Sequence, residues 1–140
     1  LSGTLTYQSG GDSTFTSTFA PEYGGVRDIA RVAGTYPGSV FGFPYTITVS
    51  PSGVITVTTQ GGARVSKAGI ELGCDFTGTL SPRPHGNVYD ISFAPSNNVI
   101  LCTPETLTGV AFFDPATNKI YVLALNSSRS RVFPFTGTKP

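Results

Sequence analysis

Residues 45–59 have the sequence YTITVSPSGVITVTT, and this stretch decides the fold. Apolar residues occupy every second position from Tyr45 to Val49, and the alternation resumes from Ile55 to Val57. A period of two is typical of β-strands with one buried face. The Pro-Ser-Gly segment between the two runs supplies turn residues. The stretch therefore predicts a β-hairpin.

The segment from Leu107 to Leu125 predicts a second hairpin. Its two arms, Leu107–Phe113 and Lys119–Leu125, flank a loop at 114–118 that begins with Asp and Pro, which favour turns. Both arms are apolar at nearly every position rather than at alternate positions. A strand of this kind is covered on both faces, or belongs to a barrel whose outer face meets another molecule. We expect cover on both faces, because it is the commoner arrangement.

Further strands are expected at intervals of about ten residues, each bounded by turn residues. They lie at Gly3–Gln8, Ser13–Phe19, Val32–Val40, Cys74–Leu80, Asn87–Phe93 and Arg131–Thr136. One short helix is expected around Pro21–Ala30, because Pro21 and Glu22 suit a first helical turn. Many short strands with so little helix predict an all-β fold.

Three glycines interrupt the strand patterns, at Gly34, Gly78 and Gly109. A glycine inside a strand weakens pairing unless the sheet bends sharply or another segment approaches closely. Its repeated use favours a strongly curved sheet. The sequence therefore predicts a single domain, residues 1–140, that forms a small closed or nearly closed antiparallel β-barrel of about eight strands. A β-sandwich is the alternative.

The composition excludes several classes of protein. Hydrophobic residues make up 39% of the 140 residues, enough to fill a core, whereas charged residues make up 12%, about half the usual share. The net charge is +1 and Lys and Arg are not clustered, so nucleic acid is not an expected partner. No apolar run reaches the roughly 18–20 residues of a membrane span. The sequence begins at Leu1 without a basic and apolar leader, as an exported protein after signal removal or a fragment would.

Two cysteines, Cys74 and Cys102, bear on the cellular compartment. With one histidine in the chain they do not suffice for the usual closed zinc site, so no metal or other cofactor is expected. An even cysteine count in a β-rich chain of low charge favours a disulfide formed in an oxidising compartment. Two buried free thiols are the alternative.

The second half of the chain resembles a group of small, largely uncharacterised exported proteins of Proteobacteria, many of them lipoproteins. The resemblance lies in a series of short motifs: GCDFTGT at 73–79, NVYDISF at 87–93, Cys102, LTGVAF at 107–112, YVLALNS at 121–127 with Arg129, and FPFTGTKP at 133–140. The first half of the chain matches this group only in its general β character.

This resemblance implies an extracytoplasmic β-barrel-like domain (periplasmic, outer-membrane-associated or secreted) in which Cys74 and Cys102 are paired. It implies no enzyme activity, because none is established for such proteins. The lipid-modified N-terminal cysteine of these lipoproteins has no counterpart in this sequence, so the resemblance leaves membrane anchoring open.

Few residues are suited to catalysis. His85, the single histidine, lies in a segment rich in turn residues, and an isolated loop histidine is more often solvated than catalytic. Asp75 and Asp90 fall on expected strands, where they could face each other as a carboxylate pair or point to solvent. The sequence contains no Gly-x-Ser-x-Gly motif, phosphate-binding loop or dinucleotide motif. We therefore expect no enzyme activity.

Aromatic residues and two arginines are the remaining candidates for a site. Phe41, Phe43 and Tyr45 flank a glycine and a proline, and such a cluster forms a binding surface if it is exposed. Arg129 and Arg131 are expected to belong to the same possible surface. Core packing, or plugging of a barrel end, is the alternative for the three aromatic residues.

Together these features predict a non-catalytic extracytoplasmic domain that binds another macromolecule, either an unknown protein or an envelope component. The alternative is a carrier of a small ligand or lipid, because a closed barrel of this size can hold one ligand in a cavity. The ten Phe residues weigh against a cavity, because they would fill a small interior. The oligomeric state is left open.

Overall fold

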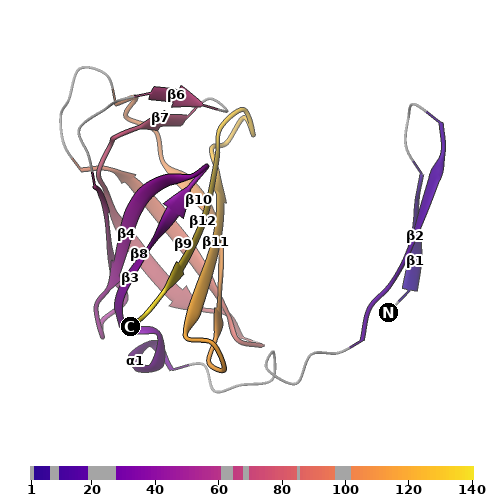
Figure 1. The fold of residues 1–140 in the computed structure, drawn as a ribbon, viewed down its shortest axis with the longest axis horizontal. Helices are drawn as coiled ribbons and strands as arrows, with labels where there is room; N and C mark the ends of the chain where they lie inside the picture. The colour runs from indigo at the N-terminus through magenta and orange to yellow at the C-terminus, as the bar shows by residue number, and fades with distance from the viewer. Residues whose placement is uncertain are drawn as a thin grey trace.

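The computed structural model describes residues 2–6, 10–18, 28–60, 65–67, 70–84, 86–96 and 102–140. Eight strands form a closed barrel in the order β10-β11-β12-β3-β4-β5-β8-β9 (Figure 1). Their bounds are Gly34–Val40 (β3), Phe43–Val49 (β4), Val54–Thr59 (β5), Phe76–Pro82 (β8), Val88–Pro95 (β9), Leu107–Asp114 (β10), Lys119–Leu125 (β11) and Val132–Thr138 (β12). Neighbouring strands are antiparallel and follow the chain order, and pairing of β12 with β3 closes the wall. The predicted fold class is confirmed.

Two smaller hairpins and one helix complete the described elements. β1 (Ser2–Thr6) pairs with β2 (Asp12–Thr16), and Figure 1 shows this N-terminal hairpin apart from the barrel. β6 (Val65–Lys67) pairs with β7 (Ile70–Leu72) beyond one end of the barrel. The helix α1 (Ile29–Val32) lies at the opposite end (Figure 1).

Most of the expected helix falls outside the described residues. The sequence predicts a helix around Pro21–Ala30, and residues 21–27 are not described; the described helix α1 begins at Ile29. The side chain of Asp28 accepts a hydrogen bond from the backbone N–H of Ala30 at 2.9 Å, which caps the first turn. Within the described residues, no helix has the length and apolar character needed to cross a membrane.

Alternation of inward and outward side chains builds the barrel core. In β4 the buried residues are Tyr45, Ile47 and Val49, the positions at which residues 45–59 predict a buried face. The largest fully buried side chains are contributed by the helix and six of the barrel strands: Val32, Tyr36, Val40, Tyr45, Ile47, Ile55, Tyr89, Phe93, Ile120, Phe133 and Phe135. These residues belong to one continuous core cluster inside the barrel.

Aromatic rings occupy the centre of this core. The ring centroid of Phe133 lies 5.1 Å from that of Phe93, 5.6 Å from that of Phe76 and 5.8 Å from that of Tyr45. All three contacts are edge-to-face, so the positive edge of one ring meets the negative face of the next. The barrel interior at this level is therefore filled by side chains.

Gly78 and Gly109 allow neighbouring strands to approach closely. A Cβ atom added at Gly78 would lie 2.0 Å from the carbonyl oxygen of Ser92, and one added at Gly109 would lie 1.9 Å from the carbonyl oxygen of Leu123. A larger residue at either position would force the adjacent strand outward. These two glycines therefore suit the tightly curved wall that their place in the sequence predicts.

Candidate functional site

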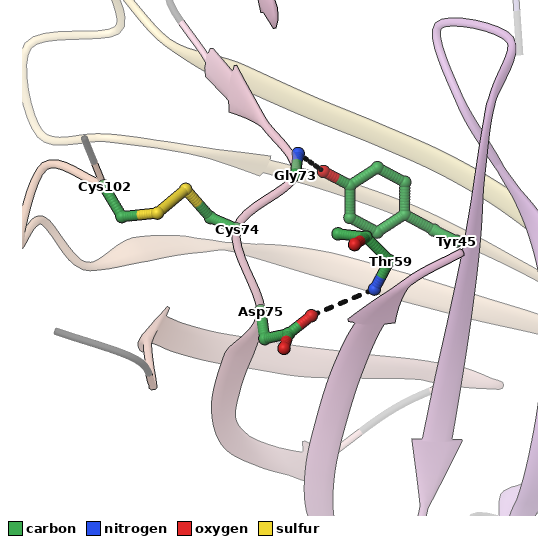
Figure 2. Close-up of a disulfide and its surroundings, with 6 residues drawn as sticks. All are labelled: Tyr45, Thr59, Gly73, Cys74, Asp75 and Cys102. Atoms are coloured by element: carbon green, nitrogen blue, oxygen red, sulfur yellow. Dashed lines mark hydrogen bonds between the residues drawn. A yellow bond between two sulfur atoms is a disulfide. The ribbon is translucent and has the colours of Figure 1, made fainter. Parts of the chain in front are cut away.

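A disulfide joins Cys74 to Cys102 at the barrel end that carries the β6–β7 hairpin (Figure 2). The two Cα atoms are 6.0 Å apart, and both side chains are buried. Cys74 precedes β8 and Cys102 precedes β10, so the bond ties the segments that enter two strands separated by β9. The predicted pairing of the two cysteines is confirmed.

Two hydrogen bonds next to the disulfide close the same end of the barrel (Figure 2). The hydroxyl of Tyr45 accepts a bond from the N–H of Gly73 at 2.8 Å, and Oδ1 of Asp75 accepts one from the N–H of Thr59 at 3.0 Å. Tyr45 is buried in the core, which contradicts its predicted place on an exposed binding surface. Burial is also the main reason that the pKa of its hydroxyl is raised.

Phe41 and Phe43, the other two aromatic candidates, lie at this end of the barrel and are partly buried against the core. Phe43 begins β4 and shares the inward side of that strand with Tyr45. Phe41 precedes it in the turn after β3, with a positive φ of 50°, an uncommon conformation for a residue with a side chain. The structure therefore separates the predicted cluster, and of its three rings Phe41 reaches the groove described below.

The two candidate arginines lie in the loop between β11 and β12. Arg129 is exposed and has a positive φ of 57°. Nε of Arg131 lies 3.4 Å from Oε2 of Glu105, in an ion pair whose side chains are about three-quarters buried. Buried Asn126 connects the same groups, because its Nδ2 donates to Glu105 at 2.9 Å and its Oδ1 accepts from the N–H of Arg131 at 3.0 Å. Arg131 therefore helps to hold this loop against the segment before β10.

A continuous apolar surface lies on the outer wall over β10, β11 and β12. We call it the apolar face, and it consists of the outward-pointing residues Val110, Phe112, Tyr121, Leu123, Leu125, Val132 and Pro134. In the strand register Val110 pairs with Leu123, Phe112 with Tyr121, and Leu123 with Pro134. The rings of Phe112 and Tyr121 stack with their centroids 6.2 Å apart. Neighbouring strands therefore bring these side chains together.

Water reaches the centre of the apolar face. The side chains of Tyr121 and Leu123 are 42% and 46% exposed. A shallow groove of about 480 Å³ runs over them and is also lined by Phe112, Pro134 and Phe41. The apolar pattern of residues 107–125 thus reflects a barrel wall with an exposed outer surface, and the expected cover on both faces is wrong for Tyr121 and Leu123.

The opposite side of the barrel has a different outer surface. Apart from Pro44 and Val54, the outward residues of β4, β5 and β8 are small and polar: Thr46, Thr48, Thr56, Thr58, Thr77, Thr79 and Ser81. Val54, 48% exposed, is the apolar exception among the outward residues of β5. Threonine favours strands as well as valine and tyrosine do, so strand formation does not require apolar residues on the outside. The composition of the apolar face therefore needs a separate explanation.

Aromatic rings fill the centre of the barrel, and a small cavity lies at its disulfide end. A cavity of about 20 Å³ lies beside the disulfide and is lined by Cys74, Phe76, Glu105 and Arg131 among others. This volume is enough for about one water molecule. A site for a small ligand or lipid usually has a volume of roughly 300 Å³ or more. The cavity is therefore too small for such a ligand, and the outer wall is the better candidate for a binding surface.

The residues considered for catalysis do not form a site within the described part of the chain. Oδ1 of Asp90 lies 2.7 Å from Nε of Arg83 in an exposed ion pair, whereas Asp75 bonds to the backbone of Thr59. His85 lies outside the described residues. In the ranges that the structure describes, no three His, Cys, Asp or Glu side chains are arranged to hold a metal ion. The two aspartates therefore have separate structural partners.

The fold and this surface define a closed, disulfide-linked up-and-down β-barrel with one apolar side. Searches for similarity find no matching family model, no matching curated protein and no matching solved structure. The apolar face is therefore the basis for the function proposed below.

Proposed function

We propose that this protein is a non-catalytic extracytoplasmic domain that binds another protein through the apolar face. The observation that carries this proposal is the exposure of Tyr121 and Leu123 at the centre of seven adjoining apolar residues. Exposed apolar patches with aromatic residues are typical of protein-binding surfaces. A protein is favoured over a small ligand because the groove is open and shallow, whereas small-ligand sites are concave and enclose most of the ligand.

The energetics of the face support binding. Removing a leucine-sized side chain from water contributes roughly 1.5–3 kcal/mol, and Tyr is among the residues that dominate binding energies at protein interfaces. The charged residues next to the face lie around its edge: Asp114 pairs with Lys119 in the register at one end, Arg131 lies near the other, and Asp90 on β9, paired with Arg83, lies beside Val110. A partner can therefore cover the centre of the face without removing a charge from water, which would be costly.

The extracytoplasmic location is supported by the disulfide. Both cysteines of the chain are used in one bond, and such bonds form and persist mainly outside the reducing cytosol. The resemblance to exported proteins agrees with this location. The alternative function, a carrier with a ligand inside the barrel, receives no comparable support, because packed aromatic rings fill the centre of the barrel and the cavity beside the disulfide measures about 20 Å³.

Leu123→Thr is the variant that tests the proposal. Threonine suits an exposed strand position, so the barrel stays folded while the centre of the face loses its apolar character. Protein immobilised in the oxidised form is exposed to envelope extract, the captured protein is identified and purified, and its affinity is measured by titration. We expect Leu123→Thr to weaken this affinity about tenfold, which corresponds to about 1.4 kcal/mol.

Val54→Thr is the matched control, because Val54 is similarly exposed but lies on the polar side of the barrel. This variant is expected to bind with unchanged affinity. Equal binding by the original protein and Leu123→Thr would disprove the proposed role of the apolar face. Equal weakening by both variants would indicate nonspecific adhesion and would count against it as well.

A further inference from the structure

The N-terminal hairpin has an exposed aromatic residue and little support of its own. Phe15 in β2 is 41% exposed, and its ring lies across Gly3 of β1, where an added Cβ would come within 2.9 Å of the ring. All described side chains of β2 are exposed. A two-stranded hairpin of this length is marginally stable by itself in water, so it gains stability from any apolar surface that receives it.

The hairpin and the apolar face are complementary in chemistry. Four large apolar side chains are exposed in the described residues: Phe15, Val54, Tyr121 and Leu123. Two of these lie at the centre of the apolar face and a third lies on the hairpin. The groove over the face, about 480 Å³ in volume and lined by Phe112, Tyr121 and Pro134, has the aromatic and aliphatic lining that a phenylalanine ring requires.

Charge does not oppose this contact. Asp12 is the one charged residue in the sequences of β1 and β2, and it lies three residues before Phe15, so its side chain points to the opposite side of the strand. A hairpin that places Phe15 over Tyr121 and Leu123 can therefore leave the carboxylate of Asp12 in water. The net charge of +1 gives copies of the chain little mutual repulsion.

We propose that two copies of this chain associate by exchanging their N-terminal hairpins, so that Phe15 of each copy packs into the groove on the apolar face of the other. A second copy is favoured over the hairpin's own barrel because, within a single chain, the hairpin stands apart from that barrel (Figure 1). A two-fold arrangement forms the contact twice, which doubles the apolar surface buried. This inference rests on the proposed binding role of the apolar face and names its occupant.

Sedimentation equilibrium of the oxidised full chain over a wide range of concentration tests the exchange. We expect a concentration-dependent dimer whose dissociation constant rises at least tenfold in Phe15→Ser and in Leu123→Thr. Val54→Thr is expected to dimerise like the original protein. Thermal unfolding is measured for every variant, and an unchanged midpoint shows that the barrel is intact.

Mixing the two defective variants provides a test specific to exchange. Phe15→Ser keeps an intact face and Leu123→Thr keeps an intact hairpin, so a mixed pair contains one complete contact, which neither variant can form alone. We expect the mixture to dimerise more strongly than either variant separately. A mixture no stronger than its components would overturn the exchange.

Other outcomes separate this inference from the proposed function. A dimer that Leu123→Thr weakens but Phe15→Ser does not would mean that two apolar faces pack together, and would overturn the role of the hairpin. A chain that stays monomeric at all concentrations would also overturn the exchange. In that case, capture of a different protein by the original chain but not by Leu123→Thr would leave the proposed function standing. A chain that neither dimerises nor captures a different protein would overturn both proposals.

Discussion

Replacing Cys74 and Cys102 together with alanine is expected to lower the free energy of unfolding by roughly 3–4 kcal/mol. The two residues are 28 positions apart, and their bond restricts the unfolded chain by closing the loop between them. In the folded state the bond ties the segments before β8 and β10, so its loss also loosens one end of the barrel. Urea unfolding of the double variant and of the oxidised original protein measures the difference, with the reduced original protein as a second comparison.

The reduced protein and the double variant are expected to unfold at similar urea concentrations, both well below the oxidised protein. The slope of the unfolding free energy against urea is expected to increase when the bond is absent, because the unfolded chain then exposes more surface. A loss of less than about 1 kcal/mol would contradict this account of the disulfide.

Phe133→Ala is expected to cost about 3–5 kcal/mol of unfolding free energy. Phe133 is fully buried, and its ring meets those of Phe93, Phe76 and Tyr45 edge-to-face, so alanine leaves a cavity that these three rings cannot easily fill. Phe133→Leu retains most of the apolar volume but loses the ring contacts, and we expect an intermediate cost. Urea unfolding at neutral pH measures all of these values.

Leu123→Ala is the matched control for this prediction. Leu123 lies on the strand next to β12 but points outward, so its truncation is expected to cost at most about 1 kcal/mol. A cost for Leu123→Ala equal to that for Phe133→Ala would mean that the inward and outward sides of the wall are wrongly assigned. It would also remove the basis for calling the apolar face a free surface.

Local pattern was sufficient to predict most of the barrel strands. Residues 45–59 form the antiparallel β4–β5 pair with the predicted side buried, and residues 107–125 form the β10–β11 pair. These elements are predictable because turn residues and a period of two are local properties of the chain. The closure of the barrel is less accessible, because Phe135 pairs with Val40 across most of the chain.

Other features were missed for identifiable reasons. The β6–β7 hairpin has strands of three residues, too short to show a reliable alternation. The sequence leaves two places for Phe41, Phe43 and Tyr45, an exposed surface next to Gly42 and Pro44 or the barrel core, because a short aromatic run does not show which rings point inward. In the structure Phe43 and Tyr45 share the inward side of β4, and Tyr45 is buried. Their division between the interior and the groove depends on the turn after β3, where Phe41 has a positive φ.

The apolar face was visible in the sequence but could not be assigned from it. An apolar strand gives the same pattern whether a second layer or an unknown partner covers its outer side. The structure distinguishes the two cases, because it leaves Tyr121 and Leu123 exposed on the wall of a barrel that is closed. Long-range closure therefore determines which of the apolar residues remain available for binding.

The most direct test of the apolar face as a binding surface is a carbene-labelling footprint of the oxidised protein. Labelling is measured in dilute solution and again in the presence of the binding partner, which is either a second copy at high concentration or the captured protein. The account predicts that labelling of Tyr121 and Leu123 falls when the partner is present, whereas labelling of Val54, on the polar side of the barrel, stays constant. Unchanged labelling of Tyr121 and Leu123 in a complex whose formation is independently shown would contradict it.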